Sequence, residues 1–207
     1  MKLSDASTEI RIAVLGGWVP SQFADVLALQ RAEEPETATV LVDGSVAGQI
    51  PPVSGSFDFA LSMNACEWTD WVCEPLWHDT LAVAVAKRSH LLAYREVPLP
   101  EVLKQPLISA QSTAEEPWRT VVHRLFEDAL PCSQQVVSTF DMAMSLVSAG
   151  YGIAIAPIAR LVGYSCRGVV ARPLAGMPLA VTAYLAHPCG SLTQPQERFA
   201  QRARSVS

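Results

Sequence analysis

The sequence predicts an α/β protein built from two Rossmann-like lobes. Short apolar runs rich in Val, Ile and Ala alternate with stretches of helical period along the chain, an order typical of helices packed on parallel strands. The order of strands and helices expected over residues 11–61 is repeated over residues 106–156, which indicates two lobes of similar topology. We place one lobe at 9–75 with 178–207 and the other at 76–177, joined by a two-strand hinge beside a cleft.

The expected strands are short, apolar and bounded by Gly, Pro or polar residues. Because most of them are apolar throughout, we expect parallel strands covered on both faces and joined by right-handed crossovers. They are residues 11–15, 38–42, 57–61, 80–86, 106–109, 135–139, 152–156, 168–171 and 179–186.

Apolar spacing predicts two helices between these strands. One run begins near Phe23 and ends near Pro35, and the other covers residues 121–130 after Pro117. A proline is well suited to the first turn of a helix, because that turn leaves its backbone nitrogens unbonded. Each run therefore predicts one helix with an apolar face.

Capping signals predict two further helices. Thr139 can cap a helix that runs to Ala149 and stops at Gly150, since threonine favours the first and glycine the last position. Thr193 with Gln196 resembles a capping box for a helix at the end of the chain.

Composition excludes several classes of protein. The chain has 207 residues, half of them hydrophobic, and a formal net charge of -5, so it is folded and poorly suited to grip DNA by itself. No apolar run approaches the roughly 20 residues of a membrane span. The first residues lack the apolar stretch of a secretory signal, so we expect a cytoplasmic protein.

No motif indicates an enzyme, a metal or a cofactor. The five cysteines are scattered and the four histidines form no HxxxH or HxH pair, so we expect free thiols and no zinc site. No nucleophile elbow or Walker sequence is present. Asp58 lies inside an apolar strand and is expected to be a hydrogen-bonded structural residue.

Several motifs in order resemble one family of regulators. "EIRIAVLGGWVPSQFADVLALQRAEEPE", "FDFALS", "EPLWHDTLAVAVAKRSHLLAYREVPLPEVLKQPLIS" and "VSTFDMAMSLVSAGYGIAIAP" look like the effector-binding domain of LysR-type transcriptional regulators. The resemblance implies a fold like that of type 2 periplasmic binding proteins, with a small-molecule effector held in the cleft between lobes. It also implies a homodimer or tetramer that contacts DNA only through an N-terminal winged helix-turn-helix. We expect that segment to be missing from this chain, either because the chain is a fragment or because the regulator has lost it.

The turn after the first strand is the first candidate effector contact. Gly16, Gly17 and Trp18 do not form the GxGxxG pattern of a dinucleotide site, and Asp43 is a weak substitute for its ribose ligand. Backbone N–H groups from Gly17 to Ser21, with the helix dipole, can instead face a small polar or anionic ligand. Two roles stay open for Trp18, which either touches the effector or covers the core.

Other candidates follow strand ends that would open toward the cleft. Ser, Thr and amide groups there are short-range donors that fix the orientation of a ligand, although Ser and Thr also serve as helix caps. The predicted effector-binding residues are Gly17, Trp18, Val19, Ser21, Ser62, Met63, Ser109, Ala110, Gln111, Thr139 and Phe140.

The effector is expected to be small and to carry a single carboxylate-like group. Arg119 is the nearest cation to the expected cleft loops, whereas Trp18, Met63 and Phe140 favour an apolar or aromatic body. One departure from the family concerns residues 44–56, where Pro51 and Pro52 disfavour the usual short helix. The nearby Trp68 and Trp71 are expected to pack in the core.

A second class of function is compatible with the same fold. A stand-alone protein that binds small solutes would share the lobes and the cleft, but the chain shows no signal peptide. A helix-turn-helix reading frame upstream would favour the regulator. Enzymatic turnover of a ligand is a distant third hypothesis.

Overall fold

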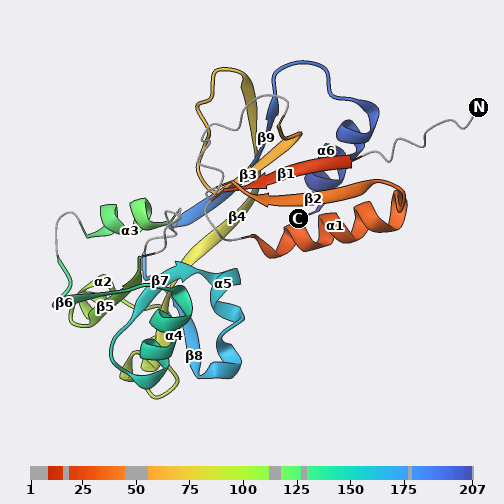
Figure 1. The fold of residues 1–207 in the computed structure, drawn as a ribbon. Coiled ribbons are helices and arrows are strands. Elements are labelled where there is room, and N and C mark those ends of the chain that lie inside the picture. Colours follow the sequence, from red (N-terminus) through yellow and green to blue (C-terminus); the bar gives the residue numbers. More distant parts are fainter. Residues whose placement is uncertain are drawn as a thin grey trace, which may run out of the picture. The chain divides into compact units, whose positions relative to one another are not determined.

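The computed structural model describes residues 9–15, 19–44, 56–111, 118–126, 130–176 and 179–206. The chain divides into two compact units, one of Met1–Trp77 with Thr182–Ser207 and one of His78–Val181. Two strands, β4 (Trp71–Ala86) and β9 (Ala180–Pro188), each run from one unit into the other. Figure 1 shows the course of the chain.

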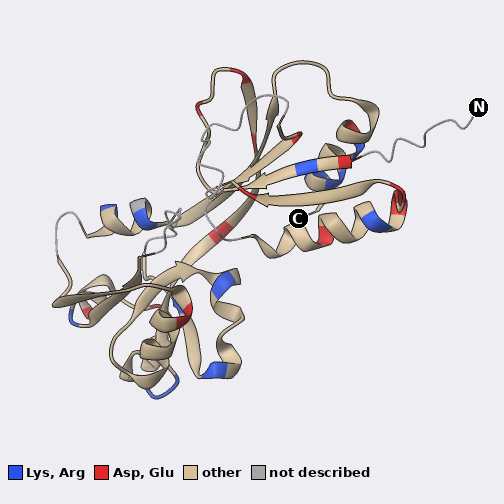
Figure 2. Ribbon diagram, in the orientation of Figure 1, with Lys and Arg blue, Asp and Glu red and all other residues tan. Residues whose placement is uncertain are grey.

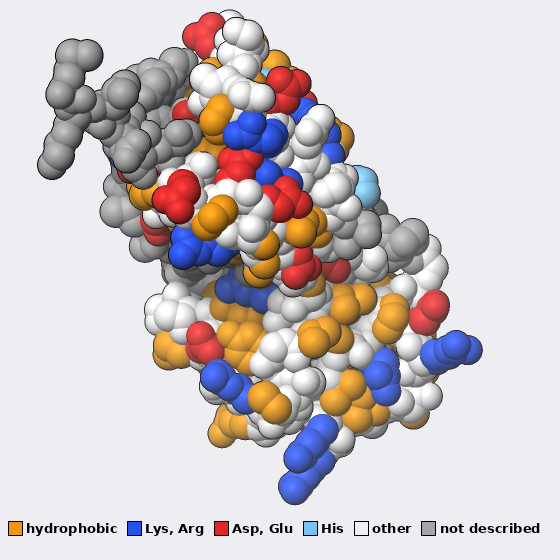
Figure 3. Space-filling model, turned by 90° about the vertical axis from the view of Figure 1, so that its right-hand side faces the viewer, with side chains coloured by type: hydrophobic (Ala, Val, Ile, Leu, Met, Phe, Trp, Pro, Cys, Tyr) orange, Lys and Arg blue, Asp and Glu red, His pale blue; other side chains and the backbone are white. Residues whose placement is uncertain are grey.

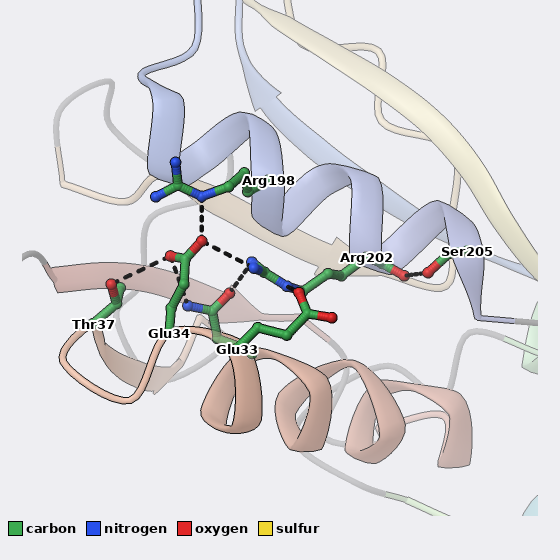
Figure 4. A network of polar contacts seen from close by, with 7 residues as sticks. Glu33, Glu34, Thr37, Arg198, Arg202 and Ser205 are labelled. Carbon is green, nitrogen blue, oxygen red and sulfur yellow. Dashed lines mark hydrogen bonds and ion pairs between the residues drawn. The ribbon is translucent and has the colours of Figure 1, made fainter.

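The first unit is built on a mixed sheet with the strand order β2-β1-β3-β9. β1 is parallel to both β2 and β3, while β9 is antiparallel to β3, with Leu185 opposite Leu61. Two helices of this unit, α1 and α6, pack on each other (Figures 1 and 4). These strands and helices are β1 (Glu9–Val14), α1 (Ser21–Glu33), β2 (Ala38–Asp43), β3 (Phe59–Ser62) and α6 (Gln194–Ser205).

The second unit combines two sheets. The end of β4 is antiparallel to both β7 and β8, and β5 is parallel to β6. A bridge between Leu107 and Ile153 joins β5 to the residue before β7. The elements are η1 (His90–Ala93), α2 (Leu99–Leu103), β5 (Pro106–Ala110), α3 (Arg119–Leu125), β6 (Ser133–Val137), α4 (Phe140–Ala149), β7 (Ala154–Pro157), α5 (Ile158–Val162), η2 (Ser165–Arg167) and β8 (Val169–Pro173).

The expectation of parallel strands is confirmed for β1 with β2 and β3 and for β5 with β6. For other pairs it was wrong, since β9 pairs antiparallel with β3, and β4 pairs antiparallel with β7 and β8. The strand expected at 135–139 lies at Ser133–Val137, and four of its five side chains are exposed. Apolar runs identified the strands but could not show their direction, which depends on partners far away in the sequence.

Both capping predictions are confirmed. The Thr139 hydroxyl accepts a hydrogen bond of 3.2 Å from the Met142 backbone N–H, and Gly150 ends α4 with φ 85°. Thr193 and Gln196 form the expected capping box at the start of α6. The helix expected over 121–130 is shorter, since α3 ends at Leu125. These helix ends follow from local chemistry, so the sequence alone could place them.

Asp58 is the structural residue expected from the sequence. Its two carboxylate oxygens accept hydrogen bonds of 2.7 Å from the Arg11 backbone N–H and 2.6 Å from the Gln196 side-chain amide. These bonds connect β1 with the start of α6. Trp71 packs in the core of the same unit, edge-on to Trp68 with ring centroids 5.6 Å apart, as expected; residues 45–55 lie outside the described ranges.

No helix within the described ranges is long and apolar enough to cross a membrane.

Candidate functional site

In the second unit, two parallel strands bring predicted site residues to one edge of a sheet. β5 and β6 run side by side with Ala110 opposite Val137, and the Gln111 backbone N–H bonds to the Val137 carbonyl. Ser109, Ala110 and Gln111 therefore lie at the same sheet edge as Thr139 and Phe140, which follow β6. The carboxyl ends of parallel strands are the usual place for ligands in α/β folds.

A pocket opens beside this edge. Its cavity volume of about 40 Å³ leaves room for little more than one water molecule, so it can take one group of a ligand and not a whole organic molecule. Ser109, Ala110 and Phe140 line it, together with residues that the sequence did not predict as a group. Those are Leu107, Ile108, Trp118, Val122, Ala143, Ala154 and Ile155, and with them lies Arg119, the cation that the sequence placed nearest to the expected cleft loops.

A guanidinium lies against two aromatic rings of this pocket. The central carbon of the Arg160 guanidinium is 3.8 Å from the Phe140 ring centroid and 4.8 Å from the Trp118 centroid. The two rings meet edge-on, 6.3 Å apart, and both side chains are buried. Stacking engages the face of the guanidinium, whereas its N–H donors lie in its plane. The pocket wall thus combines aromatic surface with the positive charge of Arg119, and Arg160, stacked on two of the lining rings, adds a second positive charge beside it.

Asp79 fixes the helix that carries Arg160. Its carboxylate accepts a hydrogen bond of 3.0 Å from the Ala159 backbone N–H and another of 2.8 Å from the Thr80 backbone N–H. Burial raises the pKa of Asp79, and the two N–H bonds act against that rise. The first turn of α5 is therefore tied to β4 by a half-buried carboxylate, which positions the next residue, Arg160.

A third ring and a second arginine extend the cluster. The Tyr164 ring packs against Phe140 at 5.4 Å, and its hydroxyl donates to the Asp141 carboxylate at 3.1 Å. Arg167 bonds to the same carboxylate oxygen at 3.0 Å. Burial, and then the bond to Asp141, raise the pKa of Tyr164. Asp141 thus has two partners of its own, and its charge is balanced by Arg167.

Predicted residues of the first unit lie at the edge where β1 and β3 end. β1 and β3 are parallel neighbours, and the Leu15 N–H bonds to the Leu61 carbonyl at 2.9 Å. Ser62 and Met63 follow at once, both buried. The Ser62 hydroxyl donates to the Asn64 carbonyl at 2.8 Å and accepts from the Asn64 N–H, so its bonds are made within its own turn.

The start of α1 carries the other predicted residues of this unit. Val19 is exposed, and Ser21 is the first residue of the helix, with its hydroxyl donating to Gln22 at 3.3 Å. Pro20 stands at the cap position and provides no side-chain cap. Gly17 and Trp18 lie outside the described residues, so the two roles considered for Trp18 both stay predictions.

Sequence reasoning missed Trp118 and Arg160. Trp118 follows Pro117, which the sequence placed in the first turn of a helix whose apolar spacing starts only at residue 121, and Arg160 follows the apolar strand in "AIAPIAR". A cation just past a strand end is the one signal that could have marked Arg160. Its stacking partners, however, lie in α4 and before α3 and are joined to it only by the fold. Among the described residues, no group of His, Cys, Asp or Glu could hold a metal ion.

Comparisons with known proteins agree with this architecture. A sequence profile described as the LysR substrate binding domain matches residues 4–207. The chain is similar in structure to the BenM effector-binding domain with its effector benzoate, at 20% identity and a TM-score of 0.84, covering 96% of this chain and 91% of that one. The effector-binding domain of QuiR in complex with shikimate matches at 20% identity and a TM-score of 0.75, over 96% of both chains.

A full-length relative extends the comparison. CbnR complexed with its target DNA matches at 15% identity and a TM-score of 0.78, over 96% of this chain and 68% of CbnR. No curated protein sequence matches the chain. The structural likenesses and the sequence profile confirm the expected fold, which is that of type 2 periplasmic binding proteins.

Proposed function

The chain belongs to the LysR substrate-binding domain family, and from this we propose that it senses a small effector for a LysR-type transcriptional regulator. The observation that carries the proposal is the pocket at the carboxyl end of β5, where Arg160 stacks on two of the lining rings. The proposal comprises ligand binding without turnover, a homodimer or tetramer, a cytoplasmic location, and DNA contact through a helix-turn-helix segment of the regulator and not through this domain.

We further propose a monocarboxylate as the effector class. BenM binds benzoate and QuiR is in complex with shikimate, and each of these ligands carries one carboxylate on a six-membered ring. The pocket of this chain supports this class, since the Phe140 and Trp118 rings give it an apolar wall, and Arg119 in its lining and Arg160 against those rings bring positive charge that suits a carboxylate. The small cavity volume of about 40 Å³ supports the entry of one group of the ligand.

The predicted site residues form part of this proposal. Ser109 and Gln111 would orient the polar group of the ligand from the end of β5, with Ala110 and Phe140 as apolar walls and Thr139 retained as the cap of α4. Ser62, Met63, Val19 and Ser21, with Gly17 and Trp18, are proposed as the contacts that the first unit contributes.

Calorimetry with matched ligands tests the effector class. Benzoate and shikimate are titrated into the chain beside benzamide, which keeps the ring of benzoate without its charge, and a sugar phosphate. We expect the carboxylates to bind and benzamide to bind at least tenfold more weakly, because only the carboxylate pairs with Arg160. Binding of benzamide as tight as that of benzoate, or binding of the sugar phosphate alone, would overturn the monocarboxylate assignment.

Two variants locate the binding. Arg160→Gln removes the charge and keeps much of the side-chain length, and we expect a tenfold or greater loss of carboxylate affinity. Lys104→Gln is the matched control, since Lys104 lies on the same unit and pairs with Glu101 at 2.6 Å. Equal losses in both variants would show a general charge effect and contradict a role for Arg160.

A further inference from the structure

We propose that the second unit carries a second ligand site, for a phosphate group, at the opposite end of α4 from the effector pocket. The site is a cavity of about 590 Å³, formed by the turn after β4, the start of β5 and the end of α4. Lys87, Arg88 and His90 line one side, and Gln105 and Tyr151 line the other. Neither the fold nor the proposed effector site requires this arrangement of side chains.

The charge of the cavity is of one sign. Its lining includes Lys87, Arg88 and His90 and no Asp or Glu. Within the described ranges, neither Lys87 nor Arg88 has an ion-pair partner, whereas Lys104 pairs with Glu101 at 2.6 Å and Arg167 with Asp141 at 3.0 Å on the same unit. Cations that line a cavity with no carboxylate in its lining favour a bound anion, because the anion relieves their mutual repulsion.

The turn that carries these cations is held by backbone bonds. The Lys87 N–H bonds to the Gly168 carbonyl at 3.0 Å, and the Ser89 N–H bonds to the Ala86 carbonyl at 2.9 Å. The Ser89 hydroxyl accepts from the Leu91 N–H at 3.2 Å, which caps η1. Because the backbone is fixed on both sides of Arg88, an anion would have to order only side chains when it binds.

The far wall is equally close-packed. Gly150 ends α4 with φ 85°, and Gly152 then passes so close to β5 that an added Cβ would lie 2.3 Å from the Pro106 carbonyl oxygen. The Ser148 hydroxyl donates to the Arg167 carbonyl at 2.6 Å, so its proton is already in use. The Gln105 amide and the Tyr151 hydroxyl are the neutral donors that this wall adds.

One feature of the fold opposes an anion at this place. The carboxyl end of α4 carries a partial negative charge equivalent to roughly half an electron. Its last carbonyls are partly neutralised, since the Gly150 N–H bonds to the Val147 carbonyl and the Tyr151 N–H to the Leu146 carbonyl. Lys87 and Arg88 bring two full positive charges, so the net field in the cavity favours an anion.

The position of the cavity separates it from the effector pocket. Phe140 lines the effector pocket at the start of α4 and Ala149 lines the cavity at its end, so these two residues lie roughly 14 Å apart along the helix at about 1.5 Å per residue. In Figure 2 the turn after β4 is blue and forms the lower end of the second unit, and Figure 3 shows Lys and Arg side chains projecting from that end.

The size and shape of the cavity suggest an ester more than a bare ion. A volume of about 590 Å³ is far larger than a phosphate group, and the Tyr151 side chain at its rim is 66% exposed. An exposed ring offers a flat surface on which the ring of a ligand can stack. The ligand class is therefore a dianionic phosphate monoester, with inorganic phosphate as the simplest member that shares its chemistry.

Calorimetry at low salt tests the site with inorganic phosphate and phenyl phosphate. We expect both to bind, phenyl phosphate several-fold more tightly, and both to weaken as NaCl is added. Lys87→Gln with Arg88→Gln should weaken both ligands at least tenfold, while Tyr151→Ala should remove only the advantage of phenyl phosphate. Equal affinity of the two ligands would assign the site to inorganic phosphate and overturn the ester.

Three controls keep this result distinct from the effector site. Lys104→Gln removes a paired cation of the same unit and should leave phosphate affinity unchanged, as should Arg160→Gln. Circular dichroism checks that the variant with both Lys87→Gln and Arg88→Gln folds. The phosphate titrations are repeated with each of these substitutions alone, because each alone changes the charge less. No binding of either ligand to the unchanged chain, or full binding to the folded double variant, would overturn the proposal, whatever the outcome with benzoate.

Discussion

Asp79 accepts a hydrogen bond of 3.0 Å from the backbone N–H of Ala159, the residue before Arg160. The carboxylate belongs to β4, close to where that strand enters the second unit, and the amide belongs to the first turn of α5. A single bond thus connects the strand that leaves one unit with the helix whose Arg160 stacks on two rings of the candidate pocket. Arg160 is held against Phe140 and Trp118 by this anchoring as well as by its own stacking.

We expect Asp79→Ala to weaken carboxylate binding about fivefold to tenfold without contact between Asp79 and the ligand. Loss of the bond to Ala159 frees the first turn of α5, and Arg160 then spends less time against the rings. Calorimetry with benzoate measures the change.

A double-mutant cycle gives the contradicting outcome for Asp79. If Asp79 acts by positioning Arg160, Asp79→Ala should cost little further affinity in an Arg160→Gln background. Additive losses would show that Asp79 acts on the ligand by another route.

Glu34 should make the first unit sensitive to acid. Hydrogen bonds from Arg198 and then Arg202 lower the pKa of Glu34 from its ordinary 4.5 to about 2, against the effect of burial (Figure 4). A carboxylate with a lowered pKa in the folded state stabilises the fold fully above its unfolded pKa, and this contribution is lost as the pH falls. The loss should run from about pH 4.5 to about pH 2.

Urea unfolding at several pH values between 5 and 3 measures this effect. Glu34→Gln should be less stable than the unchanged chain at pH 5, and the difference should shrink toward pH 3. Glu36→Gln is the control, since Glu36 is exposed and, within the described ranges, has no ion-pair partner. A difference that stays constant with pH would contradict an ionised, paired Glu34.

Arg202 should contribute more stability than a neighbouring arginine on the same helix. Its guanidinium donates to Glu33 at 2.7 Å, Glu34 at 2.9 Å and Gln30 at 2.8 Å, and the residue is only 8% exposed. Arg202→Met leaves the buried Gln30 and the part-buried Glu34 without this donor, so we expect a loss of about 3 kcal/mol in the free energy of unfolding.

Arg204 provides the comparison for this substitution. It pairs with Glu74 at 2.8 Å, but its side chain is 45% exposed, so Arg204→Met should cost less than about 1 kcal/mol. Denaturant unfolding of both variants gives the two values, and equal losses would contradict the importance of burial.

Gly152 should tolerate no side chain. A Cβ at this position would lie 2.3 Å from the Pro106 carbonyl oxygen, in the segment where β5 meets Ile153. The backbone at Gly152 or Pro106 would have to shift, so Gly152→Ala should lower the free energy of unfolding by about 2 kcal/mol. Gly163→Ala is the control, because its Cβ would meet only the Arg160 carbonyl at an ordinary 3.7 Å; a similar loss there would contradict a steric cause.

Local chemistry explains why much of the fold was predictable. Thr139 and Gly150 bound α4 because a hydroxyl caps its first turn and only glycine readily takes the left-handed conformation at its end. Thr193 and Gln196 start α6 for the same kind of reason. Strand direction was not predictable, because the antiparallel pairing of β4 with β8 joins residues about 90 positions apart.

The candidate site divides in the same way. Ser109, Ala110 and Phe140 could be predicted because strand ends and caps have local signatures, and they do line one pocket. The sequence by itself determined the alternation of strands and helices, their caps and the family resemblance, since these depend on neighbouring residues. Only the tertiary structure brought Arg160 onto Phe140 and Trp118, and placed Lys87 and Arg88 in the lining of one cavity with the end of α4. Such contacts depend on packing between distant segments, which no local pattern encodes.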